Sequence, residues 1–210
     1  MINNSQRIAE ILLDTQAVQL NVDSPFQWSS GWNSPIYCDN RITLSYPEER
    51  SYIRGSLTRL IREKFGEPDT IAGVATAGIP QGALVADEME IPFIYVRSKP
   101  KAHGMQNMIE GKADKGASVV LIEDLISTGG SSLKAAEALQ EAGLKVLGLV
   151  AIFTYGFDLS LQNFKEAEIP FYCLSNYDVL SKIALERNYI DQRQLELLQS
   201  WRSAPDQWGK

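Results

Sequence analysis

Two adjacent acids follow an apolar run in the middle of the chain, and a loop of small and hydroxyl-bearing residues comes directly after them. The run is Ala117 to Ile122, the acids are Glu123 and Asp124, and the loop is Ser127 to Ser131. Neighbouring carboxylates can accept hydrogen bonds from the vicinal hydroxyls of a ribose. The glycines of the loop allow tight turns in which backbone N–H groups converge on an anion. These residue types in this order indicate a site for a sugar and a phosphate.

The elements on either side of this stretch would position it. Ala117 to Ile122 has the small, apolar and β-branched residues of a parallel strand covered on both faces, which puts the acids at its carboxyl end, where open α/β sheets bind ligands. A helix is expected from Ser131 to Ala142, with Gly143 as its stop signal and its positive dipole end at the loop. A structural turn with solvated acids and helix-capping hydroxyls is the alternative. The chain has neither G-x-x-x-x-G-K-[ST] nor G-x-G-x-x-G, which argues against a P-loop or dinucleotide-binding protein.

The rest of the chain alternates between helical and extended patterns. The pattern predicts a helix over Asn3 to Thr15, short extended pieces up to Tyr46, and a long helix from Pro47 to about Phe65. Beyond it, we expect strands at Thr70 to Val74, Phe93 to Val96, Lys145 to Phe153 and Phe171 to Leu174, and helices at Ile79 to Asp87 and Asp191 to Trp201. This alternation predicts a single α/β domain over 1–210, with a mostly parallel central sheet flanked by helices and a small N-terminal region at 1–46.

A second small-residue turn follows the strand predicted at Thr70 to Val74. Its residues Thr76, Ala77 and Gly78 precede Ile79-Pro80, where a helix is expected to begin. Such a turn lets the backbone approach a ligand, here a pyrophosphate. Close packing between the strand and the helix is the alternative.

Cations cluster in the segment between two predicted strands. Arg97, Lys99, Lys101 and His103, the only histidine of the chain, fall within a few residues of one another. Because 98–115 has little apolar periodicity, we expect it to be a long mobile loop of the kind used as a lid over an active site. A solvated charged loop without function is the alternative.

The overall composition is typical of a cytoplasmic enzyme. The 210 residues are 44% hydrophobic and 22% charged, and 20 Lys plus Arg against 26 Asp plus Glu give a net charge of -6, which argues against nucleic-acid binding. The N-terminus lacks a cationic start followed by an apolar stretch, and Gly148 interrupts the longest apolar run, so we expect no membrane segment. Cys38 and Cys173 are not spaced as a metal or redox motif and should be buried free thiols.

The stretch from Val119 to Ser131 resembles the phosphoribosyl pyrophosphate motif of the type I phosphoribosyltransferases: four apolar residues, two acids, two apolar residues and a Thr-Gly loop. The resemblance implies the type I phosphoribosyltransferase fold, with the residues at 1–46 forming a small hood over a core at 47–210. It also implies that Mg2+ is held mainly by the substrate and not directly by the protein. The donor-binding residues implied on this stretch are Glu123 and Asp124 for the ribose, and Leu125, Ile126, Ser127, Thr128, Gly129, Gly130 and Ser131 towards the 5-phosphate.

Two further segments are similar to those of the orotate-using branch of this family. They are Arg-x-x-x-Lys-x-His at Arg97 to His103, and Phe-x-x-x-Ser-Gly-x-x-Ser-Pro-x-Tyr at Phe26 to Tyr37. The resemblance implies Mg2+-dependent transfer of the phosphoribosyl group to orotate, with pyrophosphate released. It implies that Arg97, Lys101 and His103 contact the pyrophosphate, often across a homodimer interface, and that Lys101, His103 and Asp124 are the catalytic residues. Ser127 and the backbone near Tyr37 and Cys38 would contact orotate.

The chain departs from the family pattern at three cations. Many members have a lysine at the place of Ser29, a Tyr-Lys pair at Thr76-Ala77, and an arginine just after the strand that ends here at Phe153. This chain has Thr154-Tyr-Gly-Phe157 instead. Arg41 is the predicted replacement for that arginine, because a guanidinium binds a carboxylate bidentately and Arg41 follows the base-pocket segment. An internal ion pair with Asp39 or a neighbouring acid is the alternative.

Two other functions fit the donor motif. A purine phosphoribosyltransferase would change only the acceptor, and the segment from Phe26 to Tyr37 argues against it. A non-catalytic regulator that senses the donor would need a basic face or a DNA-binding module, and neither is visible in the sequence.

Overall fold

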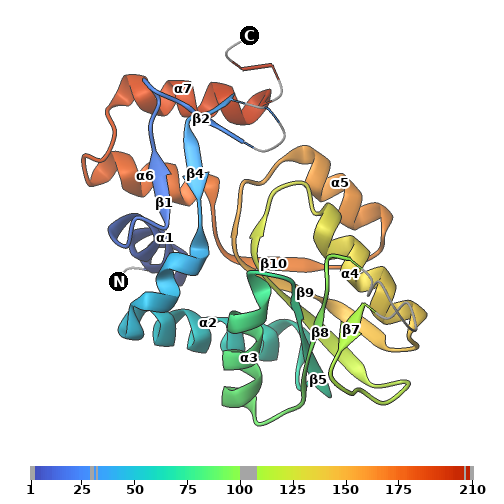
Figure 1. The fold of residues 1–210 in the computed structure, drawn as a ribbon. Coiled ribbons are helices and arrows are strands. Elements are labelled where there is room, and N and C mark those ends of the chain that lie inside the picture. Colours follow the sequence, from blue (N-terminus) through green and yellow to red (C-terminus); the bar gives the residue numbers. More distant parts are fainter. Residues whose placement is uncertain (1–2, 29–30, 32, 100–107, 206, 209–210) are drawn as a thin grey trace.

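A six-stranded sheet forms the centre of the molecule (Figure 1). The computed structural model describes residues 3–28, 31, 33–99, 108–205 and 207–208. Along the chain the strands are β5 (Thr70–Val74), β6 (Phe93–Val96), β7 (Ile109–Glu110), β8 (Ser118–Ile126), β9 (Lys145–Thr154) and β10 (Phe171–Asn176). In space their order is β10-β9-β8-β5-β6-β7, and all neighbours are parallel except β6 and β7. The predicted mostly parallel sheet is therefore confirmed.

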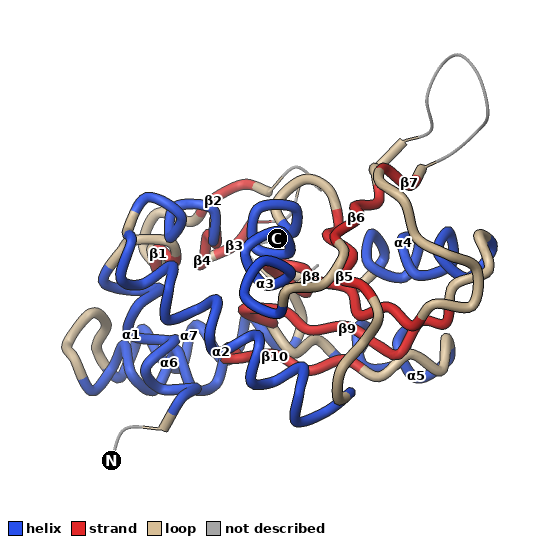
Figure 2. Tube along the Cα trace, turned by 90° about the horizontal axis from the view of Figure 1, so that it is seen from below, coloured by secondary structure: helices blue, strands red, loops and turns tan. Residues whose placement is uncertain are grey.

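Helices cover both faces of this sheet (Figure 2). One face packs against α2 (Pro47–Phe65) and α3 (Gly78–Met89), and the other against α4 (Gly130–Glu141) and α5 (Asp158–Glu166). Side chains alternate along a strand, so Val120 and Ile122 of β8 join the first core and Val119 and Leu121 join the second. Burial on both faces thus explains why the residues of β8 before Glu123 are continuously apolar and do not alternate with polar residues.

Two helices of the C-terminal half were not predicted from the sequence, α5 and α6 (Tyr177–Glu186). In α5, Leu159 and Leu161 are exposed while Phe164 is buried, so the apolar residues do not mark one face. In α6 the missed signal is Asn176, whose side chain accepts a hydrogen bond from the Val179 N–H and caps the helix.

A hood of small elements lies beside the carboxyl end of the sheet (Figure 1). Its N-terminal part contains α1 (Asn4–Asp14), β1 (Val18–Leu20), β2 (Phe26–Gln27), β3 (Asn33–Ser34), β4 (Ile36–Cys38) and the short helix η1 (Asn40–Ser45). The sequence assigned the hood to residues 1–46 alone, but α6 and α7 (Gln192–Ser203) pack there too. Trp201 of α7 is fully buried, and its Nε1 donates to the Asn33 carbonyl at 3.2 Å. Both ends of the chain therefore build the hood.

The segment predicted as an irregular lid, 98–115, contains a strand. Ile109 and Glu110 form β7, which pairs with Val96 and Tyr95 of β6, and the Arg97 N–H donates to the Met108 carbonyl at 2.8 Å. β7 forms hydrogen bonds with backbone groups of β6 at the edge of the sheet. A strand of two residues is too short for apolar periodicity to indicate it. Lys101 and His103 lie at 100–107, outside the described residues. None of the helices in the described part of the chain is long and apolar enough to cross a membrane.

Candidate active site

The strand order reverses at one place in the sheet, between β5 and β8. The chain passes from β5 to β6 on one side and then returns to β8 on the other side of β5. The loops that leave the two strands therefore diverge, and the crevice between them is where α/β proteins of this type bind ligands. The two loops are 75–78 and 127–131, the two turns that the sequence marked for anions.

The turn after β5 approaches the end of β8 very closely. A Cβ atom on Gly78 would stand 2.3 Å from the Ile122 carbonyl oxygen, so no larger residue fits there. This supports the close-packing explanation for Gly78 and also places the turn directly against the acid-bearing strand. Thr76 and Ala77 lie at its tip, and the peptide bond between Ala75 and Thr76 is cis.

The acids lie within β8, not beyond its end. The strand continues to Ile126 and pairs with β9 as far as Thr154, so the predicted boundary at Ile122 was too early. The extra residues are held by the longer partner strand, which the local pattern does not reveal. Successive residues of a strand face opposite ways, and Glu123 is accordingly directed to α4, where the Ser132 hydroxyl donates to its Oε2 at 3.3 Å.

Burial perturbs both carboxyl groups of the acid pair. The pKa of Glu123, which is 6% exposed, is raised well above its usual value by burial and then by the charge of Asp124. The pKa of Asp124 is also raised, again mainly by burial. Such a pair is destabilised while both groups are ionised, and hydroxyl donors or a nearby cation would relieve this cost. The pair therefore suits a polyhydroxylated, cation-bearing ligand.

The loop from Ser127 to Ser131 leads directly into α4. Gly129 has a left-handed backbone, with a φ of 84°, and α4 begins at Gly130 without a side-chain cap. The first backbone N–H groups of the helix thus have no capping side chain, which is the arrangement that binds phosphate. The loop is anchored from behind, because the Asn163 side chain of α5 donates to the Thr128 carbonyl at 2.9 Å.

A cavity of about 280 Å³ lies between the two loops on the side of β6. Arg97 and Lys134 both line it, together with Ala75, Gly130 and Ser131. Arg97 was predicted from the sequence, and its Nη1 is 3.4 Å from Glu110 Oε1. Lys134 was not predicted, although a lysine one helical turn after Gly130 is close to the loop from Ser127 to Ser131, the candidate phosphate loop. This cavity is therefore cationic, as a pyrophosphate site requires.

The hood meets the acid pair through η1. The Asn40 side chain donates to the Asp124 carbonyl at 2.7 Å, and the Cys38 thiol donates to Asn40 Oδ1 at 3.3 Å. Burial, and then the charge of Asp124, raises the pKa of Cys38 well above its usual value, so this thiol is neutral. Tyr37 is 41% exposed and packs against Phe26.

Arg41 is already paired. Its Nε and Nη2 donate to the two carboxylate oxygens of Asp39 at 2.6 and 2.8 Å, and this pairing lowers the pKa of Asp39. The ion pair left open by the sequence is therefore present, and any anion at Arg41 would compete with Asp39.

Comparison with known proteins places this chain in a family. The model of the phosphoribosyl transferase domain matches residues 47–170. An orotate phosphoribosyltransferase of Cytophaga hutchinsonii is 58% identical over 209 residues, which cover 100% of both chains. The chain belongs to the orotate phosphoribosyltransferase family.

Other members of the family agree in sequence and in fold. The orotate phosphoribosyltransferase of Bacteroides fragilis is 52% identical over 208 residues, covering 99% of this chain and 98% of its own. The crystal structure of the orotate phosphoribosyltransferase from Aeropyrum pernix superposes with a TM-score of 0.76 at 26% identity, covering 88% of this chain and 99% of the other. The fold of this phosphoribosyltransferase is thus the type I fold that the sequence predicted.

Two of the three positions at which an expected cation is replaced in this sequence lie among the described residues. Thr76 and Ala77 form the turn after β5, and Gly156 with a φ of 67° follows β9. Ser29 lies outside the described residues. An acceptor that carries a carboxylate would therefore need a cation from another part of the chain.

Proposed function

We propose that this phosphoribosyltransferase transfers the 5-phosphoribosyl group from phosphoribosyl pyrophosphate to N1 of orotate, giving orotidine 5-phosphate and pyrophosphate for pyrimidine synthesis. The observation that carries the proposal is the acid pair of β8, which is followed after a short loop by the uncapped start of α4, at the strand reversal.

The donor would bind across the two loops. Asp124 and Glu123 accept hydrogen bonds from the ribose hydroxyls, and the loop from Ser127 to Ser131 holds the 5-phosphate through its N–H and hydroxyl groups. The turn at Thr76 to Gly78 and the side chain of Arg97 hold the pyrophosphate. Binding at both ends fixes the anomeric carbon between them, and this positioning supplies much of the acceleration.

The site suits a donor that carries Mg2+. The two buried acids with raised pKa values favour a cation near them, while the pyrophosphate itself offers most of the oxygen ligands that this ion prefers. When bound, the metal neutralises the charge of the departing pyrophosphate.

The acceptor would lie on the hood side of the acid pair. We assign Ser127 and the backbone at Tyr37 and Cys38 to the orotate ring, because Asn40 ties this part of the hood to Asp124. Arg41 stays a predicted contact, and Asp39 competes for it. The ring nitrogen displaces pyrophosphate directly, so no covalent enzyme intermediate is required.

The remaining roles belong to the segment outside the described residues. Lys101 and His103 would stabilise the negative charge that develops on pyrophosphate, and one of them would donate a proton to it. In the homodimer that we propose, these residues come from the neighbouring subunit. We also propose a cytoplasmic location, where Cys38 and Cys173 would persist as the free thiols found here.

The deciding experiment is an assay of pyrophosphate release from phosphoribosyl pyrophosphate and Mg2+ with a panel of bases. Orotate, uracil, adenine and hypoxanthine are compared at equal concentration. The proposal expects release with orotate alone. Release with a purine would make the protein a purine phosphoribosyltransferase, and donor binding without release would make it a regulator.

A further inference from the structure

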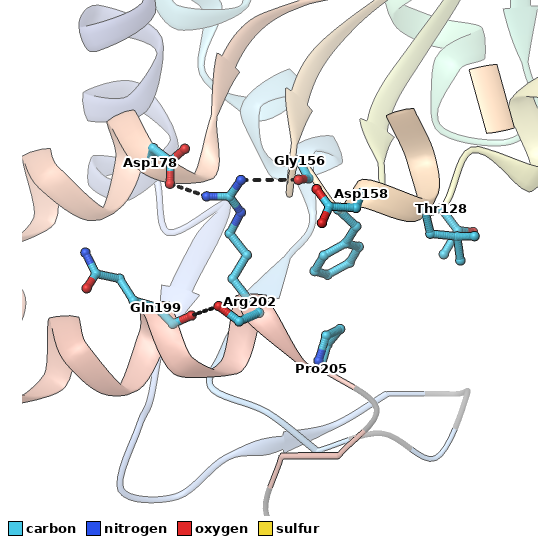
Figure 3. A pocket seen from close by; sticks show the side chains of 10 residues that line it. Thr128, Gly156, Asp158, Asp178, Gln199, Arg202 and Pro205 are labelled. Atoms are coloured by element: carbon cyan, nitrogen blue, oxygen red, sulfur yellow. Dashed lines mark hydrogen bonds and ion pairs between the residues drawn. The ribbon is translucent and has the colours of Figure 1, made fainter. Parts of the chain in front are cut away.

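A second cavity, of about 690 Å³, opens beyond the phosphate loop (Figure 3). It lies between the loop after β9, the starts of α5 and α6, and the end of α7. The lining residues that matter here are Thr128, Gly156, Phe157, Asp158, Asp178 and Arg202. Thr128 belongs to the phosphate loop, so this cavity borders the proposed donor site.

Arg202 is the cation among the described residues that line this cavity. Its Nη1 pairs with Asp178 Oδ1 and its Nη2 donates to the Gly156 carbonyl at 3.3 Å (Figure 3). These contacts hold the guanidinium from two sides and involve two of its five N–H groups. The Asp178 side chain is 68% exposed, so exchange of this carboxylate for another in the cavity costs little.

Gly156 makes room for the guanidinium. A Cβ atom on Gly156 would lie 3.4 Å from Arg202 Nη2, and a longer side chain would meet the guanidinium. An arginine from α7 thereby reaches the carboxyl end of β9, although it stands 46 residues further along the chain than Gly156.

The end of β9 is also the base side of the proposed active site. Ile126 of β8 pairs with Thr154, and the Tyr155 N–H donates to the Ile126 carbonyl at 3.2 Å, so Ser127 and Gly156 lie on adjoining strand ends. Phe157 adds an apolar wall, which suits a planar ring. Asp158 stands in the first turn of α5, where the helix dipole offsets its negative charge.

Two other arginines of the site are less suited to an acceptor anion. Arg41 is held bidentately by Asp39, and Arg97 lines the cavity on the opposite side, beside β6. We propose that Arg202 binds the carboxylate of the acceptor and is the specificity-determining residue that distinguishes orotate from uracil. The proposal rests on the proposed function, because it concerns the acceptor of that reaction.

The test compares Arg202→Gln with Arg193→Gln in steady-state kinetics. Arg193 is on the same helix but 74% exposed, next to Asp23. Arg202→Gln removes the bidentate, charge-assisted hydrogen bonds to the acceptor carboxylate and should raise the KM for orotate about tenfold to a hundredfold. The KM for phosphoribosyl pyrophosphate should change by less than about twofold. Arg193→Gln should behave as the wild type.

Two further variants separate binding from folding. Arg202→Lys keeps the positive charge but cannot form two parallel hydrogen bonds to a carboxylate, and it should give an intermediate KM for orotate. Asp178→Asn removes the internal partner of Arg202 and should leave that KM unchanged or lower it, whereas a purely structural ion pair would make Asp178→Asn as harmful as Arg202→Gln.

The outcomes distinguish this inference from the proposed function. If the wild-type protein does not use orotate at all, the proposed function fails. If it does, but Arg202→Gln keeps the wild-type KM for orotate, only the role of Arg202 fails. If Arg41→Ala raised the KM for orotate and Arg202→Gln did not, Arg41 would be the residue that binds the carboxylate.

Discussion

Two neighbouring carboxylates with different surroundings dominate the site at the scale of single residues. Glu123 is turned into the protein towards Ser132, while Asp124 lies beside Asn40 and the hood. Burial raises the pKa of both carboxyl groups, so each ionised carboxylate lowers the stability of the folded protein. Acids that cost stability in this way are typical of ligand-binding sites.

Replacing Asp124 by Asn should weaken binding of phosphoribosyl pyrophosphate. The amide is of equal size, but it loses the charge that strengthens hydrogen bonds from ribose hydroxyls, so we expect the Kd to rise about tenfold or more. Isothermal titration calorimetry with the donor and Mg2+ measures this. Asp87→Asn, at an exposed position of α3, is the control, and an unchanged Kd in Asp124→Asn would contradict the ribose role.

Replacing Glu123 by Gln should stabilise the free protein at alkaline pH. A carboxyl whose pKa is raised by folding contributes most below its unfolded pKa, and this contribution is lost as the pH rises through the folded pKa. Glutamine can keep the hydrogen bond from the Asp124 N–H without the charge. We expect a Tm about 2–4 °C above the wild type at pH ~8 and no difference at pH ~4.

Thermal unfolding at both pH values tests this, with Glu137→Gln on the exposed face of α4 as the control. A Tm difference that grows on acidification would show that the sign of the linkage is wrong. Glu123→Gln should also bind the donor more weakly, because Glu123 is proposed to accept a hydrogen bond from a ribose hydroxyl.

The unit formed by β8, the phosphate loop and α4 carries the site at the scale of secondary structure. Its geometry depends on Gly129, which combines a left-handed backbone with close contact to Phe164 of α5. Asn163 of the same helix holds the Thr128 carbonyl. The phosphate loop is therefore shaped by α5 as well as by its own sequence.

Gly129→Ala should destabilise this unit. The new Cβ would lie 2.6 Å from Phe164 Cε2 and would also suffer the strain of a positive φ, so we expect a loss of about 2–4 kcal/mol in the free energy of unfolding. Gly130→Ala is the matched control for stability, because a Cβ there meets no atom within 4 Å. Urea unfolding of the two variants tests this, and equal midpoints would contradict the proposed contact.

At the scale of the whole molecule, the C-terminal helices bind the hood to the catalytic sheet. Trp201 of α7 packs against Trp28 of the hood and against Tyr155 and Phe157, which follow β9. Its Nε1 donates to the carbonyl of Asn33, the first residue of β3. Shortening the Trp201 side chain would therefore loosen the base pocket without removing a side chain that is proposed to contact a substrate.

Trp201→Ala should therefore reduce both stability and acceptor binding. Removal of a fully buried indole costs about 3–5 kcal/mol, whereas Leu161→Ala, at a side chain that is 51% exposed, should cost less than about 1 kcal/mol. Denaturant unfolding gives the first effect. The KM for orotate should rise more than the KM for the donor, and a selective rise for the donor would mean that the hood is not the base side.

The sequence by itself determined the features that are contiguous along the chain. The acid pair, the hydroxyl-rich loop and the start of α4 follow one another within a few residues, so apolar patterning and local turn chemistry sufficed to place them on a strand, a loop and a helix. Tertiary structure was not needed to recognise this donor motif.

Only the tertiary structure decided which distant groups complete the site and where the strands end. Asn40 reaches Asp124 across 84 positions, and Arg202 reaches Gly156 because an aromatic cluster docks α7 on the end of β9. The last residues of β8 are strand because β9 continues beside them. Such contacts arise from long-range packing and sheet pairing, whose energy depends on partners that no local stretch of sequence contains.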